Sequence, residues 1–227
     1  AWTVPADQWK VYALFQTPTG QQVKRAAPGA EGNVVDHFSA AAVARYLHFF
    51  DQALTALAAE EHVRCFFNDS YEVYEANWTS ELLPQFQQRR GYDLRHYLPA
   101  LDGQDDPEIV RRVRSDYRQP IADALHENFV QPWTAWAHRH GAMSRNQAHG
   151  SPGNLLDLYA AADIPETETF GPDWIRIAGL APMPGQPPQQ GGRAEILVGK
   201  LSSSAAHVAG KPLCSSESFT WLDEHGK

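Results

Sequence analysis

The feature that most constrains the fold of this chain is an alternation of short apolar runs with longer helical sequence. Each run ends in acids, amides or an imidazole. The four clearest runs are residues 65–72 (CFFNDSYE), 141–149 (GAMSRNQAH), 162–168 (ADIPETE) and 212–219 (PLCSSESF). Strands that alternate with helices form parallel sheets with right-handed helical connections. In barrels built this way the active-site groups lie at the carboxyl ends of several strands. The pattern therefore predicts an enzyme.

Local signals predict the helices between these runs. Ser39 is a suitable cap for a helix whose apolar residues recur at spacings of three and four. These residues are Val43, Tyr46, Leu47, Phe50, Leu54 and Leu57. A second helix is expected to end at Gly91, since glycine suits the left-handed cap. Residues 106–107 (Asp-Pro) open the longest helix, which Pro120 and Pro132 are expected to kink or divide.

Residues 9–17 have the composition of a strand, and residues 33–38 that of a short strand or strand end. The count is then about five parallel strands, more than half of an eight-stranded barrel of about 250 residues. We therefore expect an α/β fold in which residues 1–227 form part of a single (β/α)8 TIM-type catalytic domain. Residues 181–192, rich in Pro, Gly and Gln, are expected to form a flexible loop. The alternative is an open doubly wound sheet, although no glycine-rich phosphate loop follows any strand.

Composition and charge narrow the possible functions. The net charge of −8 argues against nucleic acid and anionic membrane surfaces, since both require basic patches. No apolar run approaches the roughly 20 residues needed to span a bilayer. Two cysteines do not make a disulfide framework, and Cys65 and Cys214 are expected to be buried thiols. The chain starts at Ala1 and ends soon after an acid-bearing strand, so we expect it to be part of a longer polypeptide.

Three carboxylates stand out because they follow different predicted strands. Glu72, Glu168 and Glu217 each lie at or just past a strand end. A glycosidase needs two carboxyl groups across the scissile bond, one protonated to donate to the leaving oxygen and one ionised. Most glutamates are simply solvated or salt-bridged, and one alone would carry little weight. Three at successive strand ends favour the catalytic interpretation.

Other polar residues surround these acids in the sequence. Asp69 and Glu166 could bind sugar hydroxyls or a hard cation such as calcium, although Asp69 also suits a turn. Further candidates for substrate binding are Tyr71, Asn146, Gln147 and His149. A zinc site is not supported, because no His/Cys set has ligand spacing. A serine hydrolase is not supported either, because no Gly-x-Ser-x-Gly elbow is present.

At these segments the chain resembles glycoside hydrolase family 106, the α-L-rhamnosidases. The segments that carry the resemblance are NDSYE at 68–72, RRGYD at 89–93, YLPAL at 97–101 and SESFT at 216–220, supported by 32–39, 146–150 and 163–168. The resemblance implies the central part of a (β/α)8 barrel from a larger multidomain enzyme. It also implies calcium-assisted, inverting hydrolysis of terminal α-L-rhamnose in a secreted or periplasmic protein, with other domains of the same polypeptide as partners.

By position in that family, Glu72 resembles the general acid and Glu168 the base that activates water. Glu217 resembles a third carboxylate that orients substrate or water. Two alternatives remain open. One is a retaining glycosidase of another barrel family, similar to β-galactosidases, with Glu72 as acid/base and Glu217 as nucleophile about 5 Å apart. The other is a non-catalytic carbohydrate-binding fragment.

Overall fold

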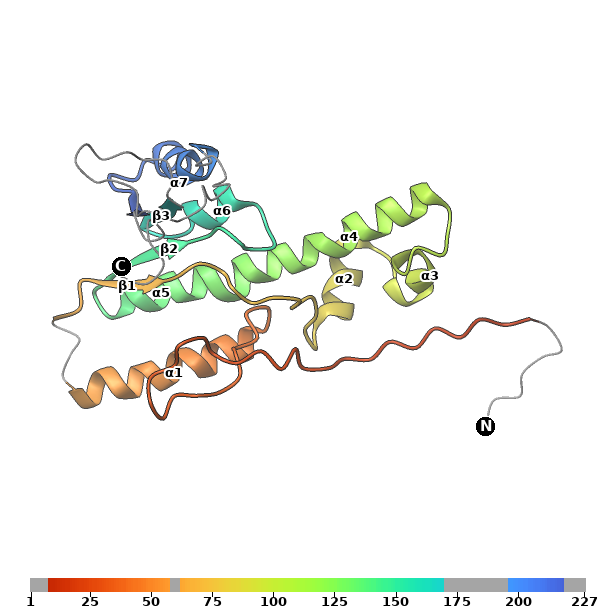
Figure 1. The fold of residues 1–227 in the computed structure, drawn as a ribbon, viewed down its shortest axis with the longest axis horizontal. Helices are drawn as coiled ribbons and strands as arrows, with labels where there is room; N and C mark the ends of the chain where they lie inside the picture. The colour runs from red at the N-terminus through yellow and green to blue at the C-terminus, as the bar shows by residue number, and fades with distance from the viewer. Residues whose placement is uncertain (1–7, 58–61, 170–195, 219–227) are drawn as a thin grey trace, which may run out of the picture. The chain divides into compact units, whose positions relative to one another are not determined.

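The computed structural model describes residues 8–57, 62–169 and 196–218 of the chain. Its helices and strands follow one another as shown in Figure 1. The order is α1 (Ala40–Leu57), β1 (Cys65–Asn68), α2 (Leu82–Arg90), η2 (Leu94–Tyr97), α3 (Leu98–Leu101), α4 (Pro107–Leu125), η3 (His126–Val130), α5 (Gln131–Arg139), β2 (Met143–Gln147), α6 (Leu155–Ala160), β3 (Ile164–Thr169), α7 (Ile196–Val208) and β4 (Ser215–Ser218). The fold is therefore α/β, as predicted.

The chain divides into two compact units. The first combines the residues up to 34 with residues 73–121, and its core is helical. The side chains of Phe86, Leu94, Ala100 and Val113 are buried together there. The predicted helix end at Gly91 is confirmed, since Gly91 adopts the left-handed conformation and donates its N–H to the carbonyl of Gln87. The Asp-Pro start of α4 is also confirmed, because Asp106 accepts the N–H of Glu108.

The predicted strand at residues 9–17 is wrong, because this segment has no regular structure. The side chains of Val11 and Phe15 are 80% and 81% exposed. A strand needs a neighbour that completes its ladder, and high β-propensity alone does not supply one. Residues 33–38 likewise form no strand, apart from one antiparallel bridge between Gln22 and Asn33.

The long helix is divided, as predicted, but only near Pro132. Pro120 lies inside α4, which continues to Leu125. Pro132 lies in the first turn of α5, directly after the point where the helix is divided. A π-helical segment, η3, connects α4 to α5. No helix among the described residues is both long and apolar enough to cross a membrane.

The second unit, which combines residues 35–72 with those from 122 onward, contains the sheet. Within the described ranges, four parallel strands are ordered β1-β2-β3-β4. Each new strand is added on the same side of the previous one. Because connections between parallel strands are right-handed, such an order places all the connecting helices on the same face of the sheet. A doubly wound sheet would instead reverse direction part-way. The described residues therefore show a parallel four-stranded sheet that grows in one direction.

Contacts identify the face of the sheet that the helices cover. The ring of Trp136 in α5 lies 4.5 Å from that of Phe66 in β1, between centroids. Thr134 of α5 donates its hydroxyl hydrogen to Ser144 of β2 at 3.0 Å. Because side chains alternate along a strand, the residues between these positions point to the other face. The Cys65 and Cys214 thiols are free, as expected, but Cys65 is only half-buried and Cys214 is exposed.

Candidate active site

The carboxylates of β3 and β4 lie on one face of the sheet. In the parallel register Glu168 is opposite Glu217, and Glu166 is opposite Ser215. Neighbouring strands are about 4.8 Å apart, so opposed residues are close neighbours. Glu166 and Glu168 are 4% and 8% exposed. This is the face opposite to Ser144 and Phe66, away from α5.

Gln147, the last residue of β2, connects two of these carboxylates. Its side-chain nitrogen lies 3.0 Å from an oxygen of Glu166 and 2.7 Å from an oxygen of Glu217. Gln147 itself is 1% exposed. Glu166 has two further partners, the guanidinium of Arg145 at 3.1 Å and the hydroxyl of Ser215. The guanidinium of Arg145 also lies 4.3 Å from the centre of the Phe67 ring.

His149 brings the loops that follow β1 and β2 together. Its Nε2 lies 3.3 Å from an oxygen of Glu168. Its backbone carbonyl accepts the N–H of Tyr71 at 3.2 Å. The loop that carries Glu72, the next residue after Tyr71, is thereby attached to the same edge of the sheet as Glu168. Glu72 is half-buried in this loop.

The remaining predicted site residues are placed as follows. Asp69 is exposed and accepts the N–H of Ser70, which is a turn contact. Asn146 is buried and accepts a hydrogen bond from Asn68 at 2.7 Å. By strand alternation Asn146 points to the face opposite that of Gln147. Its predicted role in hydroxyl binding, like that of Asp69, stays a prediction.

Sequence reasoning missed three residues around the site. Arg145 and Ser215 both bind Glu166, and strand alternation from Gln147 and Glu217 would have placed each on the right face. His37 precedes α1, and its ring packs edge-on against those of Tyr71 and Phe129, at centroid distances of 5.5 and 4.5 Å. No sequence signal marked His37 as a neighbour of Tyr71, because 34 positions separate them in the chain.

Burial changes the ionisation of two of these side chains. It lowers the pKa of His37 from 6.5 to about 4, against smaller opposing effects of the Val35 carbonyl and the Asp36 carboxylate. Burial also raises the pKa of the Tyr71 hydroxyl well above its usual range, with a smaller contribution from Asp36. At neutral pH the His37 imidazole and the Tyr71 phenol are therefore both neutral.

The low pKa of His37 predicts acid-sensitive stability. Between pH 6.5 and about 4 the unfolded chain binds a proton at His37 that the folded chain does not, so stability falls as pH falls. The full difference is about 3 kcal/mol. A His37→Phe variant keeps the ring but not the titration. We expect it to lose about 3 kcal/mol less between pH 7 and pH 4, as measured by urea unfolding at each pH.

The control for this prediction is His207→Gln, which changes an exposed histidine at the end of α7. Its stability profile should follow that of the parent protein. If the His37→Phe variant lost as much unfolding free energy between pH 7 and pH 4 as the parent protein, His37 would be protonated in the folded protein at these pH values.

Gly150 maintains the contact between the two loops. Its φ is +81°, and a Cβ there would lie 2.5 Å from the backbone oxygen of Tyr71. We expect Gly150→Ala to destabilise the protein by at least about 2 kcal/mol, from left-handed strain plus this clash.

The matched control is Gly141→Ala. Its φ is +69° with open space around it, so only strain of about 1 kcal/mol applies. Equal losses in the two variants, measured by urea unfolding, would contradict the role of the clash.

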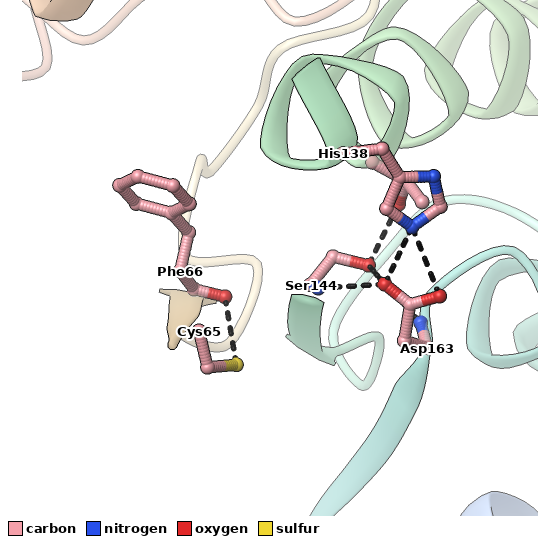
Figure 2. Close-up of polar contacts among 6 residues, drawn as sticks. Cys65, Phe66, His138, Ser144 and Asp163 are labelled. Carbon is pink, nitrogen blue, oxygen red and sulfur yellow. Dashed lines mark hydrogen bonds and ion pairs between the residues drawn. The ribbon is translucent and has the colours of Figure 1, made fainter. Parts of the chain in front are cut away.

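A serine, an aspartate and a histidine also meet at the opposite, amino end of the strands, as Figure 2 shows. The Asp163 carboxylate accepts hydrogen bonds from the N–H and hydroxyl of Ser144, and His138 lies 2.8 Å from it. Burial alone would raise the pKa of Asp163, but these hydrogen bonds lower it overall. Asp163 lies between the other two groups, whereas a catalytic triad places the histidine there. We interpret this network as structural.

Two other features do not coincide with the carboxylates. An open pocket of about 470 Å³ lies along η3, α5 and α6, and none of the predicted site residues lines it. In the part of the chain that the structure describes, no three His, Cys, Asp or Glu side chains converge as metal ligands. Calcium prefers six to eight oxygens. Calcium therefore stays a prediction of the family resemblance.

Comparison with known proteins gives consistent matches. The sequence model of a family described as alpha-L-rhamnosidase matches residues 1–225. A putative beta-glucuronidase from Formosa agariphila is 31% identical over 233 aligned positions, which cover 99% of this chain and 18% of that protein. The solved structure of a rhamnosidase from Novosphingobium sp. PP1Y is similar, with a TM-score of 0.67 and 29% identity. That match covers 87% of this chain and 18% of the rhamnosidase chain. The chain thus spans less than a fifth of the length of either relative.

Proposed function

The chain belongs to the alpha-L-rhamnosidase family, and on this premise we propose that it supplies strands and active-site loops of a (β/α)8 catalytic domain. The enzyme would hydrolyse terminal α-L-rhamnosyl linkages. The observation that carries this proposal is the row of carboxylates at the carboxyl edge of the parallel sheet. Glu168 and Glu217 are opposed there on neighbouring strands. Such edges are where barrel enzymes place their catalytic groups.

The proposed mechanism is a single displacement with inversion. Glu72 donates its proton to the glycosidic oxygen as the bond from that oxygen to C1 of the sugar breaks. Glu168 takes a proton from the water whose oxygen attacks C1 from the opposite face. The contact of Glu168 with His149 supports its role as the base, because His149 also holds the loop that carries Glu72. Glu217, bound by the amide of Gln147, would orient a sugar hydroxyl or the water.

The same premise supports the wider setting of the domain. We propose that the chain is one part of a longer multidomain polypeptide, since each match covers only 18% of the relative. A secreted or periplasmic location and a role in degrading rhamnose-containing glycans stay predictions of the family resemblance. Membership of this family disfavours the alternative of a retaining enzyme from another barrel family. An assay of glycosidase activity tests the other alternative, a non-catalytic carbohydrate-binding fragment.

A β-glucuronide is the second candidate substrate, because a curated relative is named a putative beta-glucuronidase. A glucuronide carries a carboxylate that requires a cationic partner. Arg145 lies on the candidate face, but it is paired with Glu166 and stacked on Phe67. That pairing favours a neutral sugar such as rhamnose.

The test is an assay of the full-length protein on 4-nitrophenyl α-L-rhamnopyranoside and 4-nitrophenyl β-D-glucuronide. We expect turnover of the rhamnoside and a product whose first-formed anomer, seen by proton NMR, is inverted. Preferred turnover of the glucuronide would replace the substrate assignment. Turnover of neither, with retained glycan binding, would favour the non-catalytic interpretation.

A further inference from the structure

The orientation of the Gln147 amide is determined by its two partners. Its nitrogen lies between oxygens of Glu166 and Glu217, at 3.0 and 2.7 Å. The flipped amide would place its own oxygen against both carboxylates and would be repelled. In the observed orientation the amide oxygen is buried without a hydrogen-bond partner among the described residues. An unsatisfied buried acceptor costs free energy, so the two donated bonds outweigh it.

Glu166 provides a fixed attachment for this amide. The Arg145 guanidinium, the Ser215 hydroxyl and the Gln147 amide all bind it, from strands on either side. Glu166 is 4% exposed, so its carboxylate is held out of solvent, whereas the Arg145 side chain is 39% exposed. Hydrogen bonds to a carboxylate, here from Gln147 and Ser215, are among the stronger ones in proteins, and Arg145 adds an ion pair. Gln147 is therefore held from one side by an anchored carboxylate.

The second bond of Gln147 goes to Glu217, which is half-buried near the end of β4. We infer that Gln147 is a positioning residue, which holds the Glu217 carboxylate in the orientation in which it meets the substrate. This inference rests on the proposed function. It assigns Arg145, Glu166 and Ser215 to the support of Gln147, and it leaves Glu217 as the member of the group that contacts the sugar or water.

The test is a double-mutant cycle in the full-length protein, with kcat and KM measured on the nitrophenyl glycoside that the wild type hydrolyses. Gln147→Met keeps the size of the side chain but removes both donors. We expect it to lower kcat/KM by about tenfold or more, since small misplacements of a reacting group are costly. In a Glu217→Gln background the same change should cost less than about twofold, because coupled residues are not additive.

A purely structural bond would give a different pattern. Equal losses from Gln147→Met in both backgrounds, or no loss in a folded variant, would overturn the inference. If Gln147→Met does not fold, Gln147→Asn replaces it, since that amide is one methylene too short to reach both carboxylates. Thr134→Val is the stability control. It removes a buried hydrogen bond to Ser144 on the other face of the sheet, and it should lower Tm while leaving kcat/KM within about twofold.

The two proposals fail in distinguishable ways. A wild type that hydrolyses neither glycoside overturns the proposed function and this inference with it. A wild type that turns over normally, alongside a Gln147→Met variant with the same kcat/KM, overturns only the role of Gln147.

Discussion

Replacing Glu72 with Gln in the full-length protein should strongly slow hydrolysis of substrates whose leaving group needs a proton. Glu72 follows β1 in a loop that is bound to the β2 loop through Tyr71 and His149, and it is proposed to donate that proton. General acid catalysis contributes about 10²- to 10⁴-fold. An alkyl rhamnoside should lose activity by that factor, because an alkoxide is a poor leaving group. A 2,4-dinitrophenyl rhamnoside should lose far less, since its phenolate leaves without protonation.

The comparison between the two leaving groups makes this prediction specific. Glu75→Gln is the matched control, because Glu75 is an exposed glutamate three positions further along the chain. It should leave kcat/KM on both substrates within about twofold. Equal losses on both substrates in the Glu72→Gln variant would show that Glu72 has another role, such as substrate binding. A single thermal unfolding profile for each variant checks that the loop is intact.

Local signals in the sequence predicted much of the fold. The helix after Ser39, the cap at Gly91 and the start of α4 at Asp106 all depend on residues within one or two turns. Four strand segments ending in polar side chains were also predicted, and the parallel order of their strands follows from the helices between them. Caps and amphipathic periods are local properties, so one sequence is enough to recognise them.

Properties that depend on distant partners could not be predicted. Residues 9–17 have strand composition, but no neighbouring strand pairs with them among the described residues. Asn146 and Gln147 looked equivalent in the sequence, yet strand alternation separates them onto opposite faces once the register is known. The anchoring of Glu166 by Arg145 and Ser215 needed that register too. The predicted loop at 181–192 lies outside the described residues.

The register also bears on which glutamate completes the acid–base pair. Glu168 and Glu217 are neighbours across β3 and β4, so their positions in the sheet alone do not separate their roles. Their partners differ. Glu217 is bound by an amide N–H that carries no charge, whereas Glu168 meets the imidazole of His149. We propose Glu168 as the base because His149, which also holds the Glu72 loop through Tyr71, contacts its carboxylate.

Glu168→Gln is therefore expected to lower kcat by about 10²- to 10⁴-fold on both the alkyl and the dinitrophenyl rhamnoside. The loss should not depend on the leaving group, because the base acts on water and water attacks in either case. Glu217→Gln is the paired comparison, and its main effect should be a higher KM, since it removes an orienting contact. If Glu217→Gln instead shows the leaving-group-independent loss of kcat, Glu217 is the base. If the first-formed sugar then retains its configuration, Glu217 is the nucleophile of a retaining mechanism.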